Sequence, residues 1–375
     1  MSTEHEAIVV GGGIVGASTA YHLSRDGVDT LLVDRLDEGR ATDAGAGIIA
    51  AATSSRTDND DWFAFATDAT GYYPELVESL ERDGVGETSY ARLGELSVAL
   101  DEDELEPHRA ALERIDDRSD ALEGIEPISA ADATSRFPAL AEPKEAFYDP
   151  TAARVDGRAF AEALLDAARE HGLTERTGDV TKIRTEGGAV SGVRTADGER
   201  IDAATVVVAG GAWSSSFGNQ LNVEIPVEPK RGQIAHLELP DTETADWPIV
   251  KGYRHHYIVP WPDGRIVAGA TREAGVGFEP RATAAGVKEV LEELLRVAPG
   301  LADATVSEIR VGLRPVTPDG LPVLGDVPDV DGAYLATGHG PTGLMLGPYS
   351  GRIVAELATT GTDRIPDKLR ADRFD

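Results

Sequence analysis

The chain has 375 residues, of which 41% are hydrophobic and 6% aromatic, enough apolar material for two domains with sizeable cores. Its formal net charge of −31 excludes nucleic acid and anionic membrane surfaces as partners attracted by bulk electrostatics. The absence of cysteine excludes disulfides, thiolate metal sites, cysteine nucleophiles and cofactor attachment through a cysteine.

The acidic residues are scattered along the chain, and arginine supplies most of the positive charge. This balance is typical of proteins from high-salt cytoplasms, so we expect a halophilic protein that needs molar salt to screen its self-repulsion. Polar residues 1–6 lead directly into the first apolar run, and no stretch approaches the roughly 20 apolar residues that span a bilayer. We therefore expect a cytoplasmic protein without a signal peptide or a membrane span. The eight histidines show no metal-ligand spacing, so we expect no metal site.

Residues 7–10 form a short apolar run that ends at a G-x-G-x-x-G motif made by Gly11, Gly13 and Gly16. Apolar residues at helical spacing follow, so the pattern predicts a strand, a tight turn and a helix. In such a unit the first glycine permits the turn and the second lets the backbone approach a pyrophosphate. The third glycine lets the helix pack close to the sheet.

Residues 30–33 form the next buried strand, and Asp34 follows in the position expected to bind a ribose 2′-hydroxyl. These features predict an adenine dinucleotide whose ribose carries no 2′-phosphate. The motif alone does not distinguish NAD from FAD, and a glycine turn without a ligand is the alternative.

Small residues dominate the segment 41–52, which either lies flat against a large ligand or forms a flexible loop. Residues 61–80 predict an amphipathic helix with an aromatic face, which we interpret as core rather than as a substrate box. That face contains Trp62, Phe63, Phe65, Tyr72 and Tyr73.

The next predicted elements lie outside the dinucleotide unit. Residues 94–100 alternate like a strand, and residues 102–122 predict an acidic helix. The helical pattern breaks at residues 135–140, which include Pro138, and residues 157–171 then predict a long amphipathic helix.

A β-meander follows, with turns at residues 187–188 and 197–198, and it leads into the buried strand 205–208. This strand stops on the small residues 209–211, which would let a second part of a nucleotide approach closely. A buried strand that simply ends at a glycine turn is the alternative.

Residues 223–313 are rich in strands and contain one predicted helix at residues 285–297. The Asp263-Gly264 turn predicts a hairpin in which residues 257–259 pair with residues 266–268.

The end of the chain predicts a second loop-to-helix junction. A strand at residues 334–336 is followed by a glycine-rich loop at residues 337–343 and a helix at residues 344–357. The N-terminus of that helix points into the loop, so the junction is a second candidate site for an anion.

Several motifs, taken together, resemble the FAD-dependent D-amino-acid oxidase family, closest to its glycine oxidase and D-amino acid dehydrogenase members. The match is carried by GGGIVG with Asp34 and Arg35, ARVDGRAF at 153–160, VVVAGGAW at 206–213, KRGQ at 230–233, YIVP at 257–260, GLRPVTPDGLPVLG at 312–325 and GHGPTGLMLGP at 338–348. The order and spacing of these motifs span nearly the whole chain.

The resemblance implies an α/β fold with two domains. A Rossmann-like FAD-binding domain, discontinuous in sequence, would comprise residues 1–90, 145–222 and 315–375. An α+β substrate domain with an antiparallel sheet would comprise residues 91–144 and 223–314.

The resemblance also implies which residues hold a non-covalent FAD. The pyrophosphate and adenosine sides would be held by Gly11, Gly13, Ile14, Val15, Gly16, Asp34, Arg35 and Val180. The diphosphate and flavin would be lined by Thr42, Asp43, Ala46, Gly47, Ile48, Ala209, Gly210 and Trp213, and the flavin C2 carbonyl would be met by the loop of Gly338, Thr342, Gly343, Leu344 and Met345.

On the substrate side, Arg314 matches the family arginine that clamps the substrate carboxylate, a role suited to a bidentate guanidinium. Tyr257 and His255 match positions that face the substrate. Two departures concern the pocket's charge, because Pro341 stands where glycine oxidases carry an arginine and Arg272 where they carry an apolar residue. We hypothesise a substrate larger or more polar than glycine, with Arg272 near its side chain.

The activity implied by the resemblance is oxidative deamination of a small α-amino acid, of the D-amino acid or glycine type. Hydride transfer to flavin N5 would give an imino acid that hydrolyses to the 2-oxo acid and ammonia, without a side-chain base. Oxidation of a 2-hydroxy acid or of an N-methyl amino acid of the sarcosine type is one alternative, and a non-catalytic flavin-binding subunit is another. The electron acceptor, oxygen or a quinone, the chirality of the substrate and a homo-oligomeric state stay open.

Overall fold

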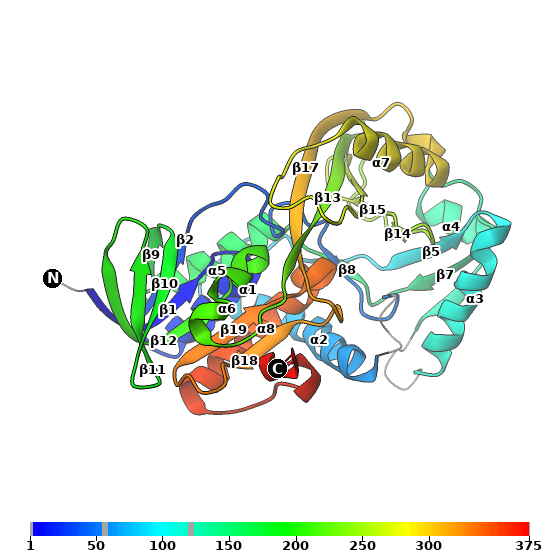
Figure 1. The fold of residues 1–375 in the computed structure, drawn as a ribbon. Helices are drawn as coiled ribbons and strands as arrows, with labels where there is room; N and C mark the ends of the chain where they lie inside the picture. The colour runs from blue at the N-terminus through cyan, green and yellow to red at the C-terminus, as the bar shows by residue number, and fades with distance from the viewer. Residues whose placement is uncertain (1–2, 55–58, 119–123, 375) are drawn as a thin grey trace.

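The computed structural model describes residues 3–54, 59–118 and 124–374. Figure 1 shows two large sheets, one beside the N-terminus and one at the far end of the molecule, and helices packed around both. Within the part of the chain that the structure describes, no helix combines the length and apolar character needed to cross a membrane.

The first sheet has the strand order β10-β11-β12-β1-β2-β9, and β19 pairs with both β12 and β18. Its central pairs are parallel, with Val9 opposite both Leu32 and Val207. Its strands are β1 (Thr3–Val10), β2 (Thr30–Asp34), β9 (Thr174–Thr177), β10 (Val180–Glu186), β11 (Ala189–Thr195), β12 (Arg200–Val208), β18 (Val323–Asp326) and β19 (Ala333–Thr337).

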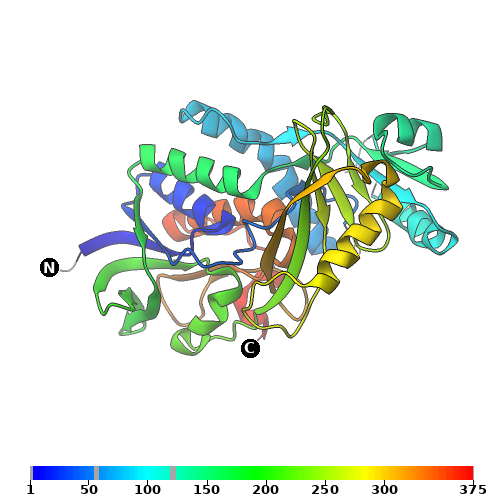
Figure 2. The same cartoon turned by 90° about the horizontal axis from the view of Figure 1, so that it is seen from above.

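Both faces of this sheet are covered, since successive side chains of a strand point to opposite faces. Val9 packs in the core that contains the helices α1, α5 and α8, whereas Ile8 and Val10 pack in a second core on the other face. Figure 2 shows these three helices side by side over the sheet. They are α1 (Ile14–Arg25), α5 (Gly157–Glu170) and α8 (Gly343–Thr360).

The second sheet has the order β17-β13-β16-β15-β14-β5-β7-β6 and is antiparallel except where β14 pairs with β5. The predicted hairpin is confirmed, with Ile258 opposite Ala268. The strands are β5 (Glu95–Ala99), β6 (Glu126–Ile128), β7 (Glu145–Asp149), β13 (Glu228–Glu238), β14 (Ile249–Lys251), β15 (Tyr257–Pro260), β16 (Arg265–Gly269) and β17 (Thr305–Val316).

A small third sheet joins β3 (Ile48–Ile49), β8 (Ala153–Arg154) and β4 (Ala91–Arg92). The remaining helices include α2 (Asp60–Arg82), α3 (Glu102–Asp116), α4 (Ala130–Arg136), α6 (Gly218–Leu221) and α7 (Ala284–Val297). Short 3-10 helices are η2 (Gly211–Phe217), η3 (Pro299–Leu301), η4 (Gly340–Thr342), η5 (Asp367–Leu369) and η6 (Ala371–Phe374).

Most predicted elements are confirmed to within a few residues. The aromatic face of α2 is buried, which confirms its interpretation as core. The acidic helix predicted for 102–122 ends earlier, since α3 stops at Asp116, and residues 119–123 lie outside the described residues. The predicted glycine-rich loop before α8 contains the helix η4.

The division into two domains stays a prediction. Two of its boundaries, at 144/145 and 314/315, cut across the second sheet, because β7 pairs with β5 and β17 continues to Val316.

Candidate functional site

A cavity of about 1650 Å³, its open mouth included, lies between the two large sheets. Its walls come from the turn before α1, the segment 40–48, the residues after β12, the loop before α8, and the strands β15 and β17. Segments far apart in the sequence therefore meet around one space, as expected for a large ligand held between two layers.

At the nucleotide end, the glycine turn is enforced by backbone contacts. Gly11 has φ +107°, and a Cβ there would lie 2.5 Å from the carbonyl oxygen of Ala209. A Cβ at Gly16 would lie 1.8 Å from the carbonyl oxygen of Gly11, so α1 packs directly on the turn. The Thr42 hydroxyl accepts a hydrogen bond of 2.9 Å from the Ile14 N–H at the start of α1.

Asp34 closes this end of the cavity at the end of β2. Its carboxylate accepts hydrogen bonds from the N–H groups of Gly12 and Leu36 and lies 3.3 Å from Arg40. Arg40, which was not among the predicted site residues, lines the cavity and also pairs with Asp43. An Arg and an Asp three residues apart are not a motif for a ligand site, so the sequence does not mark Arg40.

One side of the small-residue segment 41–52 lies along the cavity, and its other side packs closely against the rest of the protein. A Cβ at Gly45 would lie 2.5 Å from the Leu344 side chain, and one at Gly47 only 1.7 Å from the carbonyl oxygen of Val155. Gly47 also has φ +81°, a backbone conformation that favours glycine. The small side chains are thus required on the protein side of the segment.

The N-terminus of α8 supplies the second loop-to-helix junction, with Gly343 and Leu344 lining the cavity. His339 also lines it, a residue that the sequence analysis did not place in the site. Its ring is buried and lies 2.9 Å from the Ser350 hydroxyl, and burial lowers its pKa to about 3. The imidazole is therefore neutral at physiological pH.

Trp213 follows β12 and lines the cavity. Its ring is contacted by one residue that follows a strand of the first sheet and by one that follows a strand of the second. Arg35 lies over its ring at 5.6 Å, and Phe278 stacks on it with ring centroids 5.5 Å apart. Phe278 belongs to the segment 270–283 that joins β16 to α7, so this segment reaches from the second sheet to the first.

At the substrate end, Tyr257, Arg272 and Arg314 line the same cavity. Arg314 is half-buried on β17, and its Nη1 donates a hydrogen bond of 3.0 Å to the carbonyl oxygen of Thr271. Burial raises the pKa of Tyr257, while the positive charges of Arg314 and Arg272 act in the opposite direction. The structure thus brings three of the four proposed substrate residues together.

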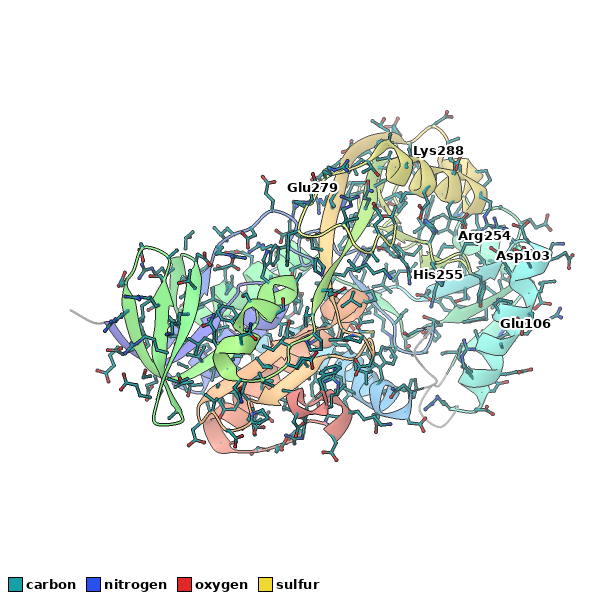
Figure 3. All side chains as sticks on the ribbon, viewed as in Figure 1. Asp103, Glu106, Arg254, His255, Glu279 and Lys288 are labelled. Atoms are coloured by element: carbon teal, nitrogen blue, oxygen red, sulfur yellow. The ribbon has the colours of Figure 1, made fainter. Side chains whose placement is uncertain are left out.

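His255 is the exception, since it is exposed and does not line the cavity. Figure 3 labels it beside Arg254 on the loop between β14 and β15. Its φ of +67° is a left-handed backbone conformation, unlike that of the strand that begins at Tyr257. Burial and the nearby charge of Arg272 lower the pKa of His255, so it lies close to the substrate end although it does not line the cavity.

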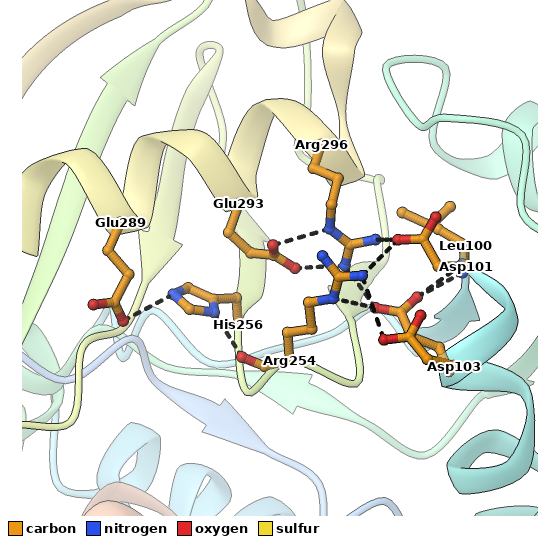
Figure 4. A network of polar contacts seen from close by, with 9 residues as sticks. Leu100, Asp101, Asp103, Arg254, His256, Glu289, Glu293 and Arg296 are labelled. Carbon is orange, nitrogen blue, oxygen red and sulfur yellow. Dashed lines mark hydrogen bonds and ion pairs between the residues drawn. The ribbon is translucent and has the colours of Figure 1, made fainter.

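The loop that leads into Tyr257 is held by a network of charged groups (Figure 4). Arg254 lies 2.7 Å from Asp101, which also pairs with Arg296 at 2.9 Å. Arg296 in turn lies 2.7 Å from Glu104 and pairs with Glu293. This network ties the loop to α3 and α7 and thereby fixes the start of β15.

The proposed cofactor residues divide into two groups. Those that line the cavity are Gly11, Gly13, Ile14, Val15, Asp34, Arg35, Thr42, Ala46, Gly47, Ile48, Val180, Ala209, Gly210, Trp213, Gly343 and Leu344. Those that do not are Gly16, Asp43, Gly338, Thr342 and Met345. The cavity thus has an acid at one end, a glycine turn at a helix N-terminus and a second helix N-terminus. These groups fit the ribose and the anionic parts of FAD.

Comparisons with known proteins agree with this geometry. The sequence model of the DAO family, described as FAD dependent oxidoreductase, matches residues 6–357. The chain is 42% identical over 352 residues to the uncharacterized oxidoreductase YurR of Bacillus subtilis, covering 93% of this chain and 94% of that protein. It is 30% identical over 376 residues to the glycine oxidase of Pseudomonas putida, covering 96% of each. The crystal structure of iminodiacetate oxidase from Chelativorans sp. BNC1 superposes with a TM-score of 0.92 and 37% identity, covering 98% of this chain and 99% of that one.

Proposed function

Because this chain belongs to the DAO family of FAD-dependent oxidoreductases, we propose that it oxidises the carbon–nitrogen bond of a small α-amino acid. The products would be the 2-oxo acid and ammonia, formed when the imino acid hydrolyses. The relatives named above include an oxidase of glycine and an oxidase of iminodiacetate. Both of these compounds are amines, glycine with one carboxylate and iminodiacetate with two.

The observation that carries this proposal is the environment of Arg314. One nitrogen of its guanidinium is held by the carbonyl oxygen of Thr271, and among the described residues it forms no ion pair. A planar, oriented and unpaired guanidinium at the end of a cofactor cavity is suited to bind a carboxylate through two parallel hydrogen bonds.

FAD, when bound, supplies the acceptor for the hydride that leaves the substrate α-carbon. The chain's part is to orient the substrate, with Arg314 on the carboxylate and Tyr257 beside it. Among the described residues, the acids that line the cavity are Asp34, Asp37 and Asp179, grouped around Arg35 at the nucleotide end. We therefore assign Arg314 and Tyr257 to positioning, and the substrate amine reacts as the free base.

The test is the visible spectrum of the purified holoenzyme, recorded anaerobically while candidate substrates are added singly. The panel contains glycine, sarcosine, iminodiacetate, D- and L-amino acids and 2-hydroxy acids. Bleaching of the flavin by an amine and not by the matching hydroxy acid supports the proposal, and recovery on admitting air identifies an oxidase. Bleaching by hydroxy acids alone, or by none of these compounds, would refute it.

A further inference from the structure

We propose that the substrate carries a second carboxylate and that Arg272 binds it. This inference rests on the proposed function and names the class of substrate, an amino acid with two carboxylates. Arg314 would hold the carboxylate next to the reacting carbon, and Arg272 would hold the one at the other end of the molecule.

The first observation is that Arg272 faces the cavity without a counter-charge. Its side chain is exposed in the cavity that it lines, and among the described residues it forms no ion pair. The guanidinium of Arg272 is partly shielded from solvent by the cavity walls, which lowers its pKa, and the nearby charge of Arg314 lowers the pKa further. Two like charges that approach each other without a carboxylate between them are unfavourable, and an anion bound to both would relieve the repulsion.

The second observation is that the neighbouring carboxylate is already committed to other residues. Glu273 lies 2.7 Å from Arg231 and accepts hydrogen bonds of 2.6 Å from Gln233 and 2.8 Å from Thr271. Burial raises the pKa of Glu273, but these partners outweigh it and lower the pKa to about 2. The acid is therefore ionised and paired, and it holds the backbone on either side of Arg272 in place.

The third observation is the distribution of charge in the cavity. In a chain of net charge −31, the described acids that line the cavity lie at the nucleotide end, whereas the substrate end carries Arg272 and Arg314. Behind this end, Lys251 lies near the buried Glu95, which offsets its charge, and Lys230 adds positive charge. A monocarboxylate would neutralise one of the two lining guanidinium groups, whereas a dicarboxylate would neutralise both.

The experiment measures binding of unreactive acids to the holoenzyme, with the change in flavin absorbance as the readout and the ionic strength held constant. Succinate and butyrate form a matched pair, because they have the same carbon chain and differ in the second carboxylate. Malonate and glutarate vary the distance between the two carboxylates. We expect at least one dicarboxylate to bind more than tenfold tighter than butyrate.

The variants are Arg272→Gln, Arg272→Glu and, as a control, Arg281→Gln. Arg281 is exposed further along the same segment, pairs with Glu279 and does not line the cavity. We expect Arg272→Gln to abolish the preference for dicarboxylates, so that their Kd rises to that of butyrate. Arg272→Glu should weaken dicarboxylates further, and Arg281→Gln should behave as the wild type.

Equal binding of butyrate and every dicarboxylate by the wild type would overturn the inference. Equal weakening of both ligand types by Arg272→Gln would overturn it as well. The reduction assay separates this outcome from failure of the proposed function. If amines bleach the flavin while the dicarboxylate preference is absent, only the inference fails. If no amine bleaches the flavin, the proposed function fails whatever the binding data show.

Discussion

Replacing Arg314 by lysine tests whether a bidentate carboxylate contact positions the substrate. The Nη1 of Arg314 donates a hydrogen bond of 3.0 Å to the carbonyl oxygen of Thr271, and the guanidinium also hydrogen-bonds the Tyr257 side chain, so it is held in a fixed plane beside the cavity. Lysine keeps the positive charge but cannot form two parallel hydrogen bonds in a fixed plane. The variant thus removes geometry while it preserves charge.

The size of the effect follows from the loss of one charge-assisted hydrogen bond, which contributes about 1.5–3 kcal/mol. At about 1.4 kcal/mol for each factor of ten, substrate affinity should fall about 10- to 150-fold. The carboxylate is bound equally before and during reaction, so the loss should appear in the substrate Kd, with the limiting rate of flavin reduction within about threefold.

The assay is anaerobic stopped-flow reduction of the flavin at increasing substrate concentration. Arg310→Lys is the matched control, because Arg310 lies on the same strand, pairs with Glu308 at 2.7 Å and does not line the cavity. An unchanged Kd for the Arg314 variant, whether or not the limiting rate falls, would refute the role of Arg314 as the carboxylate clamp.

Three further predictions concern stability. Gly47→Ala should lower the free energy of unfolding by more than about 2 kcal/mol, because the new Cβ would meet the carbonyl oxygen of Val155 at a positive φ; an unchanged urea midpoint would contradict this. Burial lowers the pKa of His339 to about 3, so its imidazole stays neutral in the folded state. In the unfolded chain the same imidazole protonates as the pH falls below 6.5, the usual pKa of histidine. The free energy of unfolding therefore falls as the pH drops. Between pH 7.5 and 5.5 the wild type should therefore lose about 1.4 kcal/mol more free energy of unfolding than His339→Gln. Parallel pH profiles for the two proteins would contradict this prediction. Finally, the net charge of −31 predicts a Tm that rises from low to molar KCl, and calorimetry showing no salt dependence would reject the halophilic interpretation.

The sequence revealed those parts of the site that depend on local backbone requirements. The turn at Gly11 and Gly16 could be predicted because only glycine fits there. The Asp263-Gly264 hairpin could be predicted because its tight turn likewise favours glycine. Arg40 could not be predicted from the sequence, because its contact with Asp34 at the end of β2 and its place in the cavity wall arise only when the chain folds.

The role of His255 stays a prediction. The resemblance matches it to a position that faces the substrate, whereas in the structure it is exposed beside the cavity and does not line it. Sheet order was equally hidden, since residues 145–149 join the second sheet through pairs with β5 and β6 that no local pattern encodes.

The stack of Phe278 on Trp213 brings one segment of the chain against both ends of the cavity. The segment 270–283 carries Arg272 at the substrate end and Phe278 over the nucleotide end, and these residues are only six positions apart. A ligand that orders this segment from one end lowers the entropy that remains to be lost at the other. Thermodynamic reciprocity then requires that substrate tighten FAD by the same factor by which FAD tightens substrate. Coupling of this kind would make cofactor retention depend on the bound substrate as well as on the glycine-rich turn.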